Sequence, residues 1–102
     1  MSHYIMLHTP IGSPEETAAA LNQEMIERFA QANATDQFPA KCLKTWNPMP
    51  HGRTEYMFCL WESSSIEDVR SSISKAGLDK VLTSDIMQVS ETDWFQLTRE
   101  TS

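Results

Sequence analysis

The sequence predicts a single α+β domain with elements in the order strand, helix, strand, strand, helix, strand. Three observations support this prediction. Two segments repeat apolar residues every three or four positions, extended segments flank both of them, and a proline-containing loop separates the two middle extended segments. A chain of 102 residues has the size of one domain, so we expect residues 1–102 to share one core.

Composition narrows the classes of function. The chain is 40% hydrophobic and 22% charged, which is typical of a globular protein, and its formal net charge is -6. Eight scattered Lys and Arg residues predict no basic surface, which argues against nucleic acid and against an anionic membrane as partners. The sequence lacks a signal-peptide pattern and a stretch that could span a bilayer. We therefore expect a cytoplasmic protein with reduced cysteines.

The first half of the chain predicts a strand and then a helix. Residues 3–8 alternate, so that one strand face carries His3, Ile5 and Leu7 while the other carries Tyr4, Met6 and His8. The run Ser13-Pro14-Glu15-Glu16 predicts a helix start, with a serine N-cap and a capping box. We expect this helix to continue to about residue 34. Its apolar stripe is formed by Ala18, Leu21, Met25, Phe29 and Ala32, with Ile26 beside it.

The second half predicts a hairpin, a helix and a last strand. Residues 38–47 and 54–62 form the hairpin around residues 48–53, in a register that pairs Cys42 with Cys59. The helix begins at Ser64 or Ser65, of which Ser64 with Glu67 makes the stronger capping box. It ends at Gly77, and its apolar stripe is Ile66, Val69, Ile73 and Ala76. Residues 86–90 form the last strand, which we extend through residues 94–97.

This register predicts how the two faces of the sheet differ. The helices should cover the more uniformly apolar face, which carries Leu43, Thr45, Tyr56, Phe58 and Leu60. The opposite face should stay uncovered. It carries Tyr4, Met6, His8, Cys42, Lys44, Trp46, Glu55, Met57, Cys59 and Trp61. An uncovered apolar face of this size predicts that a second copy of the chain packs on it.

The element order is the ferredoxin-like pattern, βαββαβ with a four-stranded antiparallel sheet. The residues Cys59-Leu60-Trp61-Glu62, Ser65, Glu67, Val69, Arg70 and Lys75-Ala76-Gly77-Leu78, with His8-Thr9, resemble the dimeric α+β barrel superfamily. The resemblance is strongest to a group of small barrel proteins that includes nickel-binding members. It implies a homodimer in which two sheets pack face to face. Other members are cofactor-independent monooxygenases of aromatic polyketides, polyketide cyclases and haem-degrading monooxygenases.

The leading functional hypothesis is a small-molecule pocket inside the barrel. Tyr4, Met6, Trp46, Met57 and Trp61 would bind a hydrophobic or aromatic molecule, and His8 would transfer a proton near neutral pH. Such a protein would be a monooxygenase, cyclase or isomerase that needs no cofactor. Lys44 and Glu55 would be polar anchors in the pocket, although an ion pair between the neighbouring strands is the simpler account of them.

The alternative hypothesis is a non-enzymatic metal-binding protein. His8, Cys42 and Cys59 are ligand types that suit nickel, copper or zinc. The sequence contains no CxxC or HxxxH motif, and the two cysteines also fit as small buried hydrophobic residues. A third reading is a structural or partner-binding barrel without chemistry.

Overall fold

The structure, a computed structural model, describes residues 1–53 and 56–101. The strands are β1 (Ser2–Pro10), β2 (Lys41–Trp46), β3 (Met57–Ser63) and β4 (Leu82–Val89). The helices are α1 (Pro14–Ala20), α2 (Gln23–Asn33), α3 (Ile66–Ala76) and α4 (Trp94–Thr101). Two 3-10 turns, η1 (Met49–His51) and η2 (Leu78–Lys80), follow β2 and α3.

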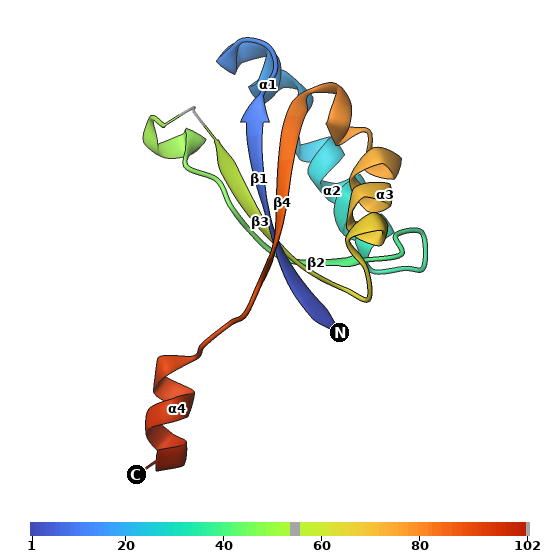
Figure 1. Ribbon diagram of the computed structural model, residues 1–102. Coiled ribbons are helices and arrows are strands. Elements are labelled where there is room, and N and C mark those ends of the chain that lie inside the picture. Colours follow the sequence, from blue (N-terminus) through green and yellow to red (C-terminus); the bar gives the residue numbers. More distant parts are fainter. Residues whose placement is uncertain (54–55, 102) are drawn as a thin grey trace.

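The sheet has the order β2-β3-β1-β4, and all of its strand pairs are antiparallel. The helices α2 and α3 lie on one of its faces, and α4 stands apart from the sheet beyond β4 (Figure 1). This arrangement confirms the predicted α+β class and the ferredoxin-like order of elements. Among the described residues, no helix has the length and apolar character needed to cross a membrane.

The predicted first helix is divided in two. Ser13 caps α1 as expected, and its side chain accepts a hydrogen bond from the Glu16 N–H. The helix stops at Leu21, and Asn22 starts α2 by accepting a hydrogen bond from the Met25 N–H. The Asn22 amide also donates to the carbonyl of Ala19. A short polar side chain that hydrogen-bonds to the nearby backbone competes with helical hydrogen bonds. The sequence analysis did not predict this break in the helix.

The second helix follows the prediction closely. Ser65 is the N-cap of α3, so the serine with the weaker capping box is the one used. Gly77 ends the helix with a φ of 76°, in the left-handed conformation that was expected. The predicted apolar stripe packs on the core. The last strand, however, begins earlier than predicted, at Leu82, and the expected extension through residues 94–97 is wrong because these residues form α4.

The predicted hairpin register is also wrong. Cys42 lies opposite Trp61, and Thr45 lies opposite Cys59, with an irregularity between Cys42 and Lys44. A bulge inserts one residue into β2 and so reverses the faces of the residues that follow it. Lys44 consequently shares the face of Leu60 rather than that of Cys42.

The helices cover the face that was predicted to stay open. Tyr4, Met6 and Trp61 are buried in the core under α2 and α3. The Phe29 and Trp61 rings pack edge to face, with their centroids 6.1 Å apart. The charged side chains decide which face is covered, because burying them would cost more than burying sulfur or aromatic groups. His3, Lys44, Glu62 and Asp85 all lie on the face that points away from the helices.

Candidate functional site

A cavity of about 270 Å³ lies between α2 and the sheet, near the carboxyl end of β1. Its walls are mostly apolar and come from β1, α2, β3, η2 and β4, with two polar residues at the end of β2. The lining residues are His8, Leu21, Met25, Ile26, Phe29, Thr45, Asn47, Met57, Cys59, Leu78 and Leu82. An apolar wall with few polar groups is typical of small-molecule sites.

His8 is the polar group buried most deeply in this cavity. Its side chain is 0% exposed, and its Nδ1 lies 2.9 Å from the Ser84 hydroxyl oxygen. Its Nε2 has no hydrogen-bond partner within residues 1–53 and 56–101. Either neutral tautomer fits the contact between Nδ1 and Ser84, and the tautomer with its proton on Nδ1 leaves Nε2 as an acceptor.

Burial controls the charge of this histidine. Desolvation lowers the pKa of His8 from 6.5 to about 4, although the hydrogen bond to the Thr83 backbone raises it in part. His8 is therefore neutral at physiological pH. A neutral imidazole with an unpartnered Nε2 can accept a hydrogen bond from a ligand, and leaving that atom unpaired costs about 1–3 kcal/mol.

The size of the cavity limits what it can hold. Small-molecule pockets commonly measure roughly 300–1,000 Å³, and an apolar cavity of about 150 Å³ suffices for benzene. At about 270 Å³, this cavity suits a molecule of roughly one ring. A second cavity of about 430 Å³ lies between α1 and η1 and shares Leu21 and Asn47 with the first, so the two adjoin.

The predicted pocket residues do not stay together. Tyr4, Met6, His8, Met57 and Trp61 lie on the helix side of the sheet, not on an open barrel face. Of these, His8 and Met57 line the cavity. Lys44 and Trp46 are exposed on the opposite face, because the bulge reverses the faces of the β2 residues that follow it. Glu55 lies outside the described residues, so the predicted pairing of Lys44 with Glu55 stays a prediction.

The two cysteines lie close together and are both free thiols. The Thr45 hydroxyl lies between them, 3.8 Å from the Cys42 sulfur and 3.3 Å from the Cys59 sulfur. The neighbouring Cys59 thiol lowers the pKa of Cys42, whereas the Cys42 thiol and burial raise the pKa of Cys59. Cys42 is therefore the thiol that ionises first.

The predicted metal site gains no support from this geometry. Within residues 1–53 and 56–101, no group of three or more His, Cys, Asp or Glu side chains is placed to hold a metal ion. His8 and Cys59 do line the same cavity, whereas Cys42 does not. Cys59 belongs to the core and Cys42 packs against it, which fits the reading of the cysteines as small core residues.

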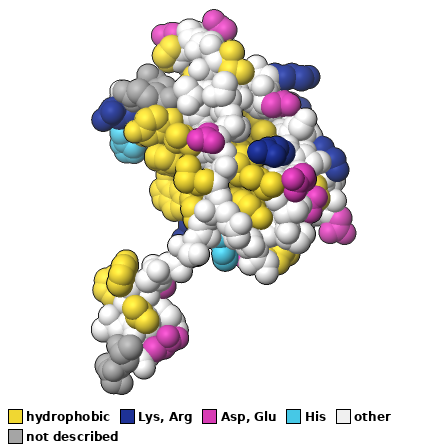
Figure 2. Space-filling view, in the orientation of Figure 1, with side chains coloured by type: hydrophobic (Ala, Val, Ile, Leu, Met, Phe, Trp, Pro, Cys, Tyr) yellow, Lys and Arg dark blue, Asp and Glu magenta, His cyan; other side chains and the backbone are white. Residues whose placement is uncertain are grey.

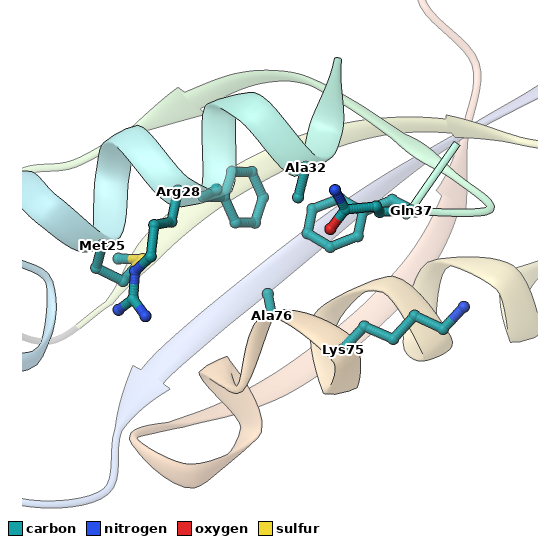
Figure 3. A pocket seen from close by; sticks show the side chains of 8 residues that line it. Met25, Arg28, Ala32, Gln37, Lys75 and Ala76 are labelled. Carbon is teal, nitrogen blue, oxygen red and sulfur yellow. The ribbon is translucent and has the colours of Figure 1, made fainter. Parts of the chain in front are cut away.

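Another cavity, of about 480 Å³, opens between α2 and α3. Its floor is apolar, and Arg28, Gln37 and Lys75 stand around it (Figure 3). All three of these side chains are exposed, and the charged ends of Arg28 and Lys75 point in different directions in the figure. Because its polar groups do not converge, this groove is a weaker candidate site than the cavity at His8.

Sequence reasoning missed one part of the site and placed another on the wrong face of the sheet. Ser84, which orients His8, comes from the polar beginning of an edge strand and gives no distinctive pattern. The wall formed by α2 and the residue Leu21 before it was signalled by the sequence, since Leu21, Met25 and Phe29 belong to the predicted apolar stripe. The error lay in the choice of the sheet face on which that stripe packs.

No family model matches this chain, and no curated protein matches it. Solved structures share its fold. SCO4226 from Streptomyces coelicolor A3(2) is 17% identical, with a TM-score of 0.57 over 90% of this chain and 100% of that chain. SnoaB, a cofactor-independent oxygenase from Streptomyces nogalater, is 13% identical, with a TM-score of 0.50 over 89% of this chain and 92% of that chain.

A third structure, a REP-associated tyrosine transposase bound to a REP hairpin, is 12% identical, with a TM-score of 0.52. The match covers 98% of this chain and 61% of the transposase. These likenesses show the ferredoxin-like fold, which proteins of different activities share.

Proposed function

We propose that this protein forms a homodimer and binds a small aromatic or hydrophobic molecule in the cavity at His8. The observation that carries the proposal is the unpartnered Nε2 of a fully buried histidine that lines an apolar cavity. The ligand would present a hydroxyl or N–H group to this nitrogen and its ring to the apolar wall. The proposal invokes no cofactor.

The pKa of His8 determines whether this side chain accepts a hydrogen bond or a proton from a ligand. A phenol has a pKa near 10, so moving its proton to an imidazole with a pKa of about 4 costs about 8 kcal/mol. His8 is therefore equipped to accept a hydrogen bond. The oxygenase, cyclase or isomerase reactions suggested by the fold need a stronger base, so under that reading a bound ligand must raise the pKa of His8 towards neutrality.

The test compares two probes of similar shape, phenol and toluene, of which only phenol can donate a hydrogen bond. Binding would be followed by two-dimensional NMR titration of the labelled full chain. Replacing His8 with leucine should reduce the affinity for phenol relative to toluene about fivefold, the value of one hydrogen bond of about 1 kcal/mol. The matched control is His3→Leu, on the same strand but on the opposite face.

A further variant tests the cavity itself. Ile26 lines it and is half exposed, so Ile26→Trp should narrow the cavity without unfolding the chain and should weaken both probes. The proposal fails if neither probe binds, or if His8→Leu changes the binding of phenol and toluene equally. Where phenol binds, a nitrogen-15 pH titration of the His8 ring would show whether the bound ligand raises the pKa of His8.

A further inference from the structure

The C-terminal helix α4 carries large apolar side chains that the rest of the chain does not cover. Trp94 is 72% exposed, Phe95 81% and Leu97 45%. The helix stands away from the sheet at the end of the chain (Figure 1). On a helical wheel, Trp94 and Leu97 share one side, and Gln96 and Glu100 share the other.

The start of α4 is fixed by its own cap. The Asp93 carboxylate accepts a hydrogen bond from the Gln96 N–H at 2.9 Å, so the sequence specifies a helix at this point. A helix of eight residues is nevertheless unstable alone in water, where isolated helices need about 12–15 residues. It therefore needs a surface on which its apolar side can pack.

The open face of the sheet carries an apolar surface, with the charged Lys44, Glu62 and Asp85 around it. We call it the open-face patch, and it consists of Ile5, Leu7, Trp46, Phe58, Leu60 and Met87. Trp46 and Met87, at its two edges, are each about half exposed. Figure 2 shows hydrophobic side chains gathered on the side of the sheet that faces away from α2 and α3, and again on α4.

The accessible surface of the chain is larger than that expected for a compact monomer of the same mass. Its accessible surface is 6858 Å². A compact monomer of 11.6 kDa should expose roughly 5,800 Å², which is about 1,000 Å² less. A standard interface buries about 800 Å² on each partner. The radius of gyration, 14.9 Å, also exceeds the roughly 13 Å of a compact domain of this length.

We infer that α4 is an exchanged arm, which packs Trp94 and Leu97 onto the open-face patch of a second copy of the chain. The direction of the chain favours a second copy over the helix's own sheet. Residues 90–93 continue away from the sheet beyond β4 and would have to reverse to bring α4 back over it (Figure 1). The inference rests on the homodimer of the proposed function and assigns α4 a role in it.

The first test measures the mass of the full chain by analytical ultracentrifugation over a concentration series. The arm variant is Trp94→Asp with Leu97→Asp, and its control is Gln96→Glu, a charge change on the polar side of the same helix. We expect a wild-type dimer, an unchanged control, and a dissociation constant at least about thirtyfold higher in the arm variant. A dimer of unchanged strength in the arm variant overturns the inference and leaves the homodimer standing.

The second test asks which surface receives the arm. The patch variant is Trp46→Glu with Met87→Glu, two half-exposed positions at which the fold should survive, as circular dichroism would verify. Each variant alone should be monomeric. A mixture should form a heterodimer, because the intact arm of the patch variant meets the intact patch of the arm variant. A mixture that stays monomeric overturns the inference, since it is the result expected if α4 packs on its own sheet or on another α4.

Ligand binding separates the two proposals. Phenol binding at His8 does not require α4, so an arm variant that is monomeric and still binds phenol supports both. A wild-type chain that stays monomeric at 100 μM overturns the exchanged arm and the homodimer together, and leaves the binding site to its own test.

Discussion

The burial of His8 predicts that the protein loses stability in mild acid through this one side chain. The pKa of His8 is lowered to about 4 in the folded chain, against 6.5 when it is unfolded. A histidine with a lowered folded pKa stabilises the fold fully above pH 6.5, and this contribution is lost as the pH falls towards 4, because the unfolded chain binds the proton more readily. The complete loss corresponds to about 3 kcal/mol, of which about 2 kcal/mol is lost by pH 5.

The measurement is urea unfolding at pH 7.5 and pH 5.0, followed by circular dichroism. A loss of about 2 kcal/mol should lower the urea midpoint by roughly 1–2 M. The His8→Leu variant has no imidazole to protonate. Between the two pH values, its urea midpoint should therefore fall by roughly 1–2 M less than that of the wild type. His3→Leu, on the open face, should behave like the wild type. If His8→Leu loses as much stability between pH 7.5 and 5.0 as the wild type, the buried neutral state assigned to His8 is wrong.

Three further predictions concern other parts of the fold. Ser65→Ala should reduce the free energy of unfolding by about 1 kcal/mol, because it removes the N-cap of α3, whereas Ser64→Ala should change it by less than half of this amount in the same urea assay. Iodoacetamide at pH 8 should label Cys42 well before Cys59, as read by mass spectrometry of peptides, because Cys42 ionises first and is less buried; equal rates would contradict the assigned order. Trp61→Ala should cost about 3–5 kcal/mol by thermal and urea unfolding, since the side chain is fully buried among aromatic rings, and a cost below 1 kcal/mol would argue against this core.

The order of the elements could be predicted from the sequence because local signals determine it. The serine cap at Ser13, the left-handed glycine at Gly77 and the apolar stripes of both helical regions act within a few residues of themselves. Ser84, the hydrogen-bond partner of His8, could not be predicted, because β1 and β4 are brought together only by the tertiary fold.

The faces of β2 could not be predicted, because they depend on one residue in that strand. The bulge between Cys42 and Lys44 changes which side chains share a face, and no composition or turn signal in that strand marks it. Uniform apolar character was also a poor guide, since Phe58 and Leu60 lie on the open face while the helices cover sulfur and aromatic groups. The distribution of charged residues along β1, β3 and β4 was the better signal.

The bulge has a consequence for how the protein avoids forming fibres. The strands β2 and β4 are the two edges of the sheet, and an unprotected edge can recruit strands from other molecules without limit. The irregular β2 carries Lys41 and Lys44, and β4 carries Asp85 in its middle, so both edges are poor templates for another strand. Growth along the sheet is thereby disfavoured, whereas the proposed contact through its face would close after two copies.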